Sequence, residues 1–455
     1  MNSFFISWFM IVHNFNKQFF LLLIDKLNIS GIKYCIVGDY KDLPESIGHD
    51  VDFWTENVKV FHEILEDVVN ETNFNILIDN ANGLPGFNMA VFKVVNENEL
   101  YLMKWDVFSS ESAWKQILPL RRKTDVEKLY RPYKNFYVRT DEETALSHFL
   151  YPMFEWGYIK KDIYKSDILE FYQKSCFRQS FVNLWGVKMA DKIQKLISRE
   201  QWSEIEKRMP SLRLIAILKG LLKYRVWYNI CMASLGVLRR MIHPSGKVIA
   251  ICGLDGAGKT TILDELNDIF VNLLKRKKVY SGYWRPYVLP EIRELFGKKN
   301  SKAGVDRVAQ KGKTIRSNSR KVSSPAVSFI KMFYYWIDYI LAEIKYGSVH
   351  QRGGVVLFDR HYIDMIVHPQ RFGMNLPREV MLFFYKFIPK PDRTFFLWCT
   401  PDEITARKQE FTKEEIQVMM DGYLEVGKSI KNFKTIHTNT TIEREICDVM
   451  NSMTN

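Results

Sequence analysis

A glycine-rich stretch in the second half of the chain has the spacing of a phosphate-binding loop, because Gly253–Thr260 reads GLDGAGKT. Glycines let successive backbone N–H groups converge on phosphate oxygens, and the start of a following helix adds a favourable dipole. The Lys259 ammonium would neutralise the β- and γ-phosphates, and the Thr260 hydroxyl would join a Mg²⁺ shell. We therefore predict that the chain binds ATP, or another nucleoside triphosphate, together with Mg²⁺. The expected nucleotide-binding residues are Gly253, Gly256, Ala257, Gly258, Lys259, Thr260 and Thr261.

The sequence around this loop has the pattern of the elements that would hold it. Lys247–Cys252 is a β-branched apolar run typical of a strand, and apolar residues from Ile262 to Leu273 recur at helical spacing after the loop. Pro244-Ser245-Gly246 punctuates the chain before the strand. Strands and helices then alternate, which predicts an α/β domain with a doubly wound parallel sheet over residues 244–455.

Two further motifs follow the loop. Val355–Phe358 precedes Asp359-Arg360-His361, and Pro391-Asp392-Arg393 leads into the strand-like run Thr394–Cys399. Together with the loop, these motifs resemble thymidylate kinases over about residues 246–455. With Asp364, Pro369 and Arg371 included, the pattern is more similar to thymidylate-kinase-like proteins associated with bacterial surface-polysaccharide biosynthesis.

The resemblance implies roles for individual side chains. Asp359 would face the Mg²⁺ ion or the attacking group, and Arg360 would clamp the phosphate of the acceptor. Asp255, inside the loop, would face the sugar of the acceptor. Together with Lys259, these residues would carry catalysis, and a surface salt bridge is the alternative for Asp359 and Arg360.

Three more basic residues are placed around the acceptor by the same resemblance. Arg285 would bind the acceptor, and Arg407 and Lys408 would belong to the lid, with Arg407 catalytic and Lys408 on the acceptor. A surface salt bridge is again the alternative. Thymidylate kinases have Arg-Glu-Pro-Gly where this chain has Trp284-Arg285-Pro286, and Ala406–Glu410 is no arginine-rich loop. Thymidylate is therefore not the expected substrate.

A strongly basic segment lies between the second and third strands of this domain. Gly297–Lys321 carries nine Lys and Arg residues against one acid, Asp306, and has few large apolar residues. This composition predicts a flexible loop. It is either a solvated charge run or a lid that attracts an anionic acceptor.

The first part of the chain has paired carboxylates. Asp50 and Asp52 stand at i and i+2 in a strand-like run, so they point to one face, and two like charges so close are costly unless a cation lies between them. Asp106 lies in the apolar run Leu100–Phe108. This spacing resembles minimal nucleotidyltransferases of the polymerase-beta type over about residues 20–110, which implies that the three carboxylates hold Mg²⁺. That family has small residues where this chain has Gly38-Asp39, so an inert binding module or a pair of strand-edge aspartates is the alternative.

The length and composition of the chain indicate how it is divided into domains. A chain of 455 residues suits two or three domains. We expect an α+β nucleotidyltransferase-like domain at 1–140, a helical connector at 141–243 and a P-loop thymidylate-kinase-like domain at 244–455. The six cysteines have no short spacing, and the apolar start Phe4–Val12 is expected to be a buried helix, not a signal peptide. We therefore expect a cytoplasmic protein.

The net charge of +13 leaves several partners open. Residues 212–241 are apolar but interrupted by basic side chains, which predicts a linker helix or a helix on the inner surface of a membrane. Nucleic acid is not the favoured partner, because only charge and a polymerase-like fold would support it. The expected partner is a small-molecule or glycan phosphate acceptor.

The motifs together predict an ATP-dependent kinase acting on a sugar, sugar phosphate, glycan intermediate or nucleotide in surface-polysaccharide biosynthesis, with nucleotidyl transfer as a second activity to be tested. One alternative is a regulatory protein that binds or hydrolyses ATP and carries an inert nucleotidyltransferase-like module. A second alternative is a thymidylate kinase.

Overall fold

The computed structural model describes residues 13–38, 40–48, 50–84, 86–109, 112–113, 118–119, 130–159, 161–292, 322–409 and 411–453. The chain forms two compact units. Of the described residues, one unit contains those up to Phe74 and those within Ala81–Met89 and Met103–Arg239, and the other contains Asn75–Asn80, Ala90–Leu102 and those from Arg240 onward. The α/β class expected from the sequence is confirmed, while the predicted division into three domains stays a prediction.

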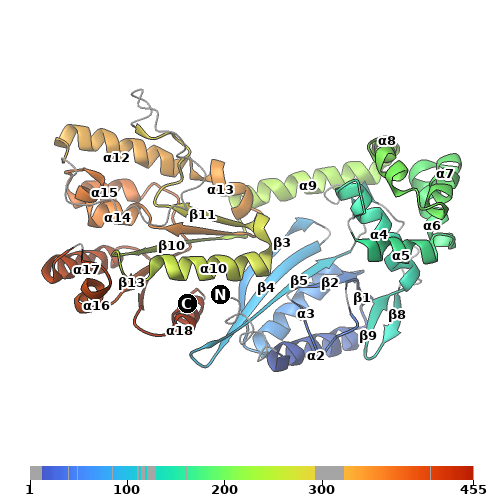
Figure 1. The fold of residues 1–455 in the computed structure, drawn as a ribbon, viewed down its shortest axis with the longest axis horizontal. Coiled ribbons are helices and arrows are strands. Elements are labelled where there is room, and N and C mark those ends of the chain that lie inside the picture. Colours follow the sequence, from blue (N-terminus) through green and yellow to red (C-terminus); the bar gives the residue numbers. More distant parts are fainter. Residues whose placement is uncertain are drawn as a thin grey trace. The chain divides into compact units, whose positions relative to one another are not determined.

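Five parallel strands form the central sheet of the second unit (Figure 1). Their order is β11-β12-β10-β13-β14, and each neighbouring pair is parallel. β10 and β12 are buried along most of their length, which explains their continuous β-branched and aromatic sequences. An all-parallel sheet of this order is consistent with a P-loop domain. The strands are β10 (Lys247–Gly253), β11 (Val279–Tyr283), β12 (Val355–Asp359), β13 (Arg393–Trp398) and β14 (Phe433–His437).

Helices cover both faces of this sheet (Figure 1). On one face, α10 begins directly after the glycine-rich loop and buries Ile262, Leu266 and Phe270. On the other face, Ala342 and Tyr346 of α13 pack with apolar residues of β10 and β12. The helices are α10 (Lys259–Leu274), η2 (Arg276–Lys278), α12 (Pro325–Ile340), α13 (Ala342–His350), α14 (Tyr362–Val367), η5 (Pro369–Phe372), α15 (Arg378–Tyr385), α16 (Pro401–Arg407), α17 (Lys413–Gly427) and α18 (Ile442–Asn451).

The first part of the chain contains a mixed seven-stranded sheet. Its order is β3-β4-β5-β2-β1-β9-β8, with β1 antiparallel to β2 and β2 parallel to β5. Buried Phe20, Phe53 and Trp105 belong to its aromatic core. The elements are α2 (His13–Ser30), β1 (Tyr34–Ile36), β2 (Asp50–Thr55), α3 (Val58–Glu71), β3 (Asn75–Leu84), β4 (Gly86–Val95), β5 (Glu99–Phe108), β8 (Tyr130–Tyr133) and β9 (Phe136–Arg139), with a separate two-stranded pair β6 (Ser112–Ala113) and β7 (Leu118–Pro119).

A helical region follows and begins at Asp141, as the sequence predicts. Its core includes Phe149, Phe181 and Trp185, all buried. The helices are α4 (Asp141–Glu155), α5 (Asp162–Phe171), α6 (Ser175–Trp185), α7 (Val187–Ser198), α8 (Trp202–Leu221) and α9 (Tyr224–Ile242). Among the residues that the structure describes, no helix combines the length and the apolarity needed to cross a bilayer.

Three sequence predictions concern residues outside the described part of the chain. These are the helix at Phe4–Val12, the turn residue Asp39 and the basic segment Gly297–Lys321.

Candidate active site

The glycine-rich loop connects the end of β10 to the start of α10. Gly253 has a φ of +145°, and a Cβ atom at this position would lie 2.5 Å from the carbonyl oxygen of Leu397. Gly258 caps α10 in the left-handed conformation with a φ of +80°. Both positions therefore require glycine. The loop that results ends at the N-terminus of a 16-residue helix, where an anion is stabilised.

Lys259 is buried at the base of this loop. Its ammonium donates a 2.5 Å hydrogen bond to the carbonyl oxygen of Leu254 and lies 3.6 Å from Oδ1 of Asp255. Burial, together with the nearby Arg360 guanidinium, lowers the pKa of Lys259 to about 8. The Lys259 ammonium is thus present at neutral pH but is easily deprotonated above it.

Asp255 lies at the centre of a group of basic side chains. Nη2 of Arg360 donates to its Oδ1, and Nη2 of Arg371 donates to its Oδ2 at 2.8 Å. The ammonium of Lys408 lies 4.0 Å from Oδ2. Burial alone would raise the pKa of Asp255, but Arg360, Lys259 and the other cations hold that pKa well below its usual range. One carboxylate therefore shares four cations, which leaves a net positive charge beside the phosphate loop.

Arg360 is held in place by a second carboxylate. It follows β12, has a φ of +74°, and its Nη1 donates to the carbonyl oxygen of Gly253 at 3.1 Å and to Oδ1 of Asp364 at 2.8 Å. Asp364 also accepts a hydrogen bond from the Tyr423 hydroxyl at 2.7 Å. His361 is buried beside it, and burial lowers its pKa to about 4, so it is neutral at neutral pH. The guanidinium is therefore oriented before any ligand binds.

Asp359 ends β12 and is the carboxylate best suited to a metal ion at this site. Its Oδ1 is buried and has no hydrogen-bond partner among the described residues. Burial raises its pKa, although Lys259 and Arg360 oppose that shift. A buried carboxylate oxygen without a donor fits a ligand of Mg²⁺. Thr260 and Thr261 are exposed in the first turn of α10, where hydroxyl groups can reach a bound nucleotide.

Arg407 binds the outer side of the loop. Its guanidinium donates to the carbonyl oxygens of Gly256 at 3.3 Å and Thr438 at 3.2 Å. The Thr438 hydroxyl in turn donates to the carbonyl oxygen of Ala257 at 3.0 Å. These contacts fix the backbone of the loop, and the predicted catalytic role of Arg407 stays a prediction.

Arg285 lies in a different environment from the Asp255 group. It is almost fully buried, its guanidinium carbon lies 4.3 Å from the ring centre of Tyr287, and its Nη1 lies 3.5 Å from Oδ2 of Asp338 in α12. Nε and Nη1 of Arg285 have no hydrogen-bond partner among the described residues. The contact with Asp338 is a buried ion pair, not the surface pair that the sequence left as the alternative.

The N-terminal carboxylates lie on adjacent strands. β2 and β5 pair in parallel with Asp52 opposite Asp106 and Asp50 opposite Lys104. The buried Lys104 ammonium donates to Oδ2 of Asp106 and lies 3.9 Å from Oδ2 of Asp50. A protein cation therefore lies between two of the carboxylates predicted to bind Mg²⁺. The metal-binding role of Asp50, Asp52 and Asp106 stays a prediction.

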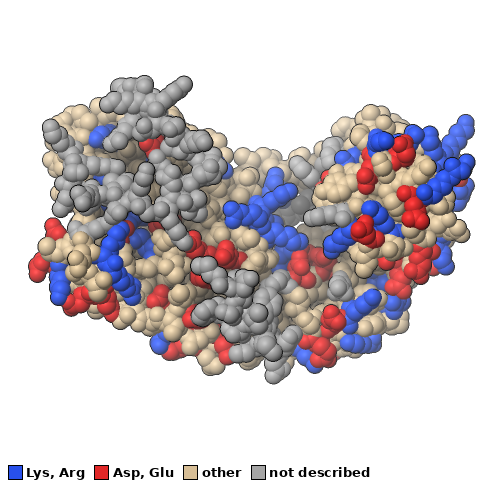
Figure 2. Space-filling view, in the orientation of Figure 1, with Lys and Arg blue, Asp and Glu red and all other residues tan. Residues whose placement is uncertain are grey.

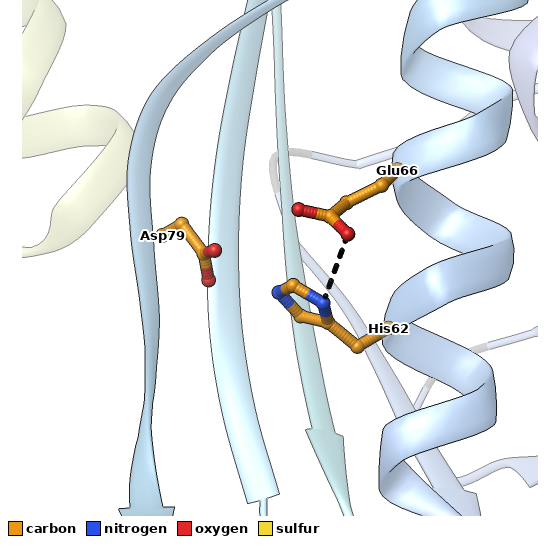
Figure 3. Close-up of side chains that lie close together, drawn as sticks. All are labelled: His62, Glu66 and Asp79. Atoms are coloured by element: carbon orange, nitrogen blue, oxygen red, sulfur yellow. Dashed lines mark ion pairs between the residues drawn. The ribbon is translucent and has the colours of Figure 1, made fainter.

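A histidine and a glutamate form another ionic contact in this part of the chain. His62 and Glu66 lie one turn apart on α3, with Nδ1 of His62 3.4 Å from Oε2 of Glu66 (Figure 3). The contact is ionic only when the imidazole is protonated, and such an i,i+4 pair then adds about 0.2–0.5 kcal/mol to a helix. We assign it to the stability of α3.

Two residues of these sites had no role in the sequence interpretation. Arg371 was part of a family pattern, but nothing in the sequence placed it 2.8 Å from Asp255, 116 positions away. Lys104 had a local signal, because it stands two residues before Asp106 and thus on the same face of the strand.

No protein-family model matches the chain, and no curated protein sequence matches it. Among solved structures, the chain is similar to the thymidylate kinase of Ehrlichia chaffeensis, with 17% identity and a TM-score of 0.30 over 46% of this chain and 98% of that one. It is also similar to the thymidylate kinase of Candida albicans, with 15% identity and a TM-score of 0.32 over 46% of this chain and 93% of that one. Likeness at this level carries no argument about the site, so the interpretation of the site depends on the geometry described above.

Proposed function

We propose that this chain is an ATP-dependent phosphotransferase in which the loop Gly253–Thr260 binds the nucleotide. The observation that carries the proposal is the group of four cations on Asp255, next to the buried carboxylate of Asp359. A cationic cluster at the start of a helix suits the phosphates of a nucleoside triphosphate. Two of these four cations, Arg371 and Lys408, suit an anionic acceptor.

Catalysis in this proposal is positional and electrostatic. Lys259 and Arg360 neutralise charge on the transferring phosphoryl group, and Arg360 does so from a fixed position because Asp364 orients it. Thr260 and Asp359 would hold Mg²⁺, which when bound offsets the charge of the phosphates. If the acceptor group is a phosphate, no general base is needed, because its oxygen is already a nucleophile. A hydroxyl acceptor would need Asp359 or Asp255 to take its proton, and Asp359 could do so only where it faces the attacking group in place of Mg²⁺.

The acceptor in this proposal is a sugar, sugar phosphate or glycan intermediate. Its support is the departure from thymidylate kinases at Trp284-Arg285-Pro286, where Arg285 is buried and paired with Asp338 and is therefore not free to bind the phosphate of thymidylate.

Phosphoryl transfer from γ-labelled ATP tests the proposal. We expect wild-type protein to label an acceptor, and Lys259→Ala to lower the rate by about 10²–10³ with the fold retained. Lys277→Ala, which removes an exposed lysine of η2, is the matched control and should keep the parent rate. Unchanged turnover in Lys259→Ala would exclude the kinase assignment. Hydrolysis of ATP without any labelled acceptor would favour a regulatory ATPase.

A further inference from the structure

α9 presents an apolar stripe to solvent. Its members stand at i, i+3, i+4, i+11 and i+14 and therefore share one face of the helix. They are more than half exposed: Tyr224 at 85%, Trp227 at 58%, Tyr228 at 59%, Leu235 at 53% and Leu238 at 57%. We call these five residues the α9 stripe. The opposite face is the buried one, since Val226 packs into the helical core.

The α9 stripe is not covered by packing within the unit that contains α9. Large apolar side chains exposed singly are ordinary, but a run of five along one helix is typical of a surface that binds a partner or a membrane. The preceding helix adds Leu214, Leu218 and Leu222, spaced at i, i+4 and i+8 and also more than half exposed. Exposed apolar side chains are therefore present on both α8 and α9.

The charges beside the α9 stripe indicate what kind of surface would cover it. No Asp or Glu stands between Glu206 and Asp255, whereas Lys219, Lys223 and Arg239 are exposed there. Elsewhere on the helical region, Figure 2 shows acidic and basic side chains intermixed. A stretch that is purely basic beside an apolar stripe complements a surface that is both anionic and apolar.

We propose that the α9 stripe docks on an anionic lipid bilayer. A helix of this kind lies in the plane of the interface, with its apolar face in the headgroup and acyl boundary. The two tyrosines suit the headgroup level, because their rings are apolar with one polar atom, whereas Nε1 of Trp227 already donates to the carbonyl oxygen of Leu221 at 2.9 Å and its ring would supply apolar contact. Lys223 and Arg239 lie near opposite ends of the helix and would contact lipid phosphates. This docking does not depend on the proposed kinase activity.

Vesicle co-sedimentation of the full chain tests the proposal. The probes are phosphatidylcholine vesicles with and without phosphatidylglycerol, at low and high salt. Trp227→Glu/Leu235→Glu places two charges in the stripe at exposed positions, so circular dichroism should stay unchanged. Ile163→Glu/Val187→Glu is the matched control, because both residues are also more than half exposed but lie on α5 and α7.

We expect wild-type protein and the control to bind phosphatidylglycerol vesicles, and the stripe variant to bind them roughly tenfold more weakly or worse. Lys223→Gln/Arg239→Gln should weaken binding to anionic vesicles and reduce its salt dependence. Equal binding by the stripe variant, or no binding by wild-type protein, would overturn the proposal. A dimer in sedimentation velocity that Trp227→Glu/Leu235→Glu dissociates, without vesicle binding, would assign the stripe to a second copy of the chain.

Discussion

Nη2 of Arg371, in the short helix η5, lies 2.8 Å from Oδ2 of Asp255 in the phosphate loop. Arg360, in the loop directly after β12, donates to the other carboxylate oxygen, so Asp255 is bound by two arginines that both follow β12. Asp255 therefore holds together cations that would repel one another without it. A phosphate that enters this group replaces part of the charge that Asp255 supplies.

The first prediction concerns the stability that Asp255 confers. Its pKa in the folded state is depressed, so the unfolded chain binds the proton more readily, and stability rises with pH across that window. The contribution is complete above about pH 5 and is lost as the pH falls toward the folded-state pKa. We expect Asp255→Asn to cost about 2 kcal/mol at pH 7 and most of that still at pH 3.5, because the contribution disappears only as the pH approaches the folded-state pKa.

Calorimetry of the full chain measures this effect in the transition that ATP shifts upward. Arg371→Ala should give a smaller loss, because three cations remain on Asp255. Arg378→Ala removes only a partner of the exposed Glu425 and serves as the control. A loss in Asp255→Asn that has already disappeared at pH 3.5 would contradict the depressed pKa of Asp255.

The second prediction concerns proton uptake when ATP binds. The pKa of Lys259 is lowered to about 8 in the free protein, and a bound triphosphate should raise it because it stabilises the ammonium. Titration calorimetry at pH 8.5 in buffers of different ionisation enthalpy should show proton uptake, whereas at pH 6.5 Lys259 is already protonated and should contribute none. Heats that are independent of the buffer at pH 8.5 would show that the pKa of Lys259 is not lowered.

Much of the fold is predictable from local patterns, and what is not depends on distant partners. Strand Lys247–Cys252 and the helix after it are read directly from apolar periodicity. β8 (Tyr130–Tyr133) cannot be predicted in this way, because a proline such as Pro132 argues against a strand. It is tolerated because β8 is an edge strand of the sheet, where a missing N–H costs little.

The residues of the candidate site also fall into those that local sequence predicts and those that depend on distant contacts. The loop glycines and Lys259 are local features, so their geometry follows from the sequence. The grouping of Asp255 with Arg371 and Lys408 depends on where η5 and α16 end in space, which no local pattern specifies. The pairing of Asp52 with Asp106 requires knowledge that β2 and β5 are neighbours.

The third prediction concerns the buried pair of Arg285 and Asp338. Both side chains are almost fully buried, and Asp338 also accepts hydrogen bonds from the backbone N–H groups of Tyr287 and Leu289. Arg285→Ala leaves this carboxylate without its counter-charge and removes the contact with the Tyr287 ring. We expect a loss of about 2–4 kcal/mol in unfolding experiments, against no loss in Arg276→Ala on the exposed η2. An unchanged stability with a raised KM for the acceptor would instead assign Arg285 to acceptor binding alone.

The fourth prediction concerns the cation between the N-terminal carboxylates. Lys104→Met removes the ammonium that Asp50 and Asp106 share, which should lower the free energy of unfolding by about 1–3 kcal/mol. Mg²⁺ should restore part of that loss in Lys104→Met and should stabilise wild-type protein less. An equal effect of Mg²⁺ on both proteins would show that Lys104 does not stand in for a metal ion.

If wild-type protein does transfer nucleotides, Asp50→Asn/Asp52→Asn should abolish release of pyrophosphate while ATP still binds at the loop. Release at the parent rate in this double variant would show that these carboxylates are not the site.

The last prediction concerns the acceptor. Thymidylate kinases have Arg-Glu-Pro-Gly where this chain has Trp284-Arg285-Pro286, and here the arginine is buried against Asp338 and Tyr287. Because that cation is already paired, we expect little transfer from ATP to thymidylate even at millimolar acceptor. A cell-envelope glycan extract should in contrast contain a component that the wild-type protein labels and that Lys259→Ala does not. A kcat/KM for thymidylate of roughly 10⁴ M⁻¹s⁻¹ or above would identify a nucleotide kinase and remove the need for a glycan acceptor.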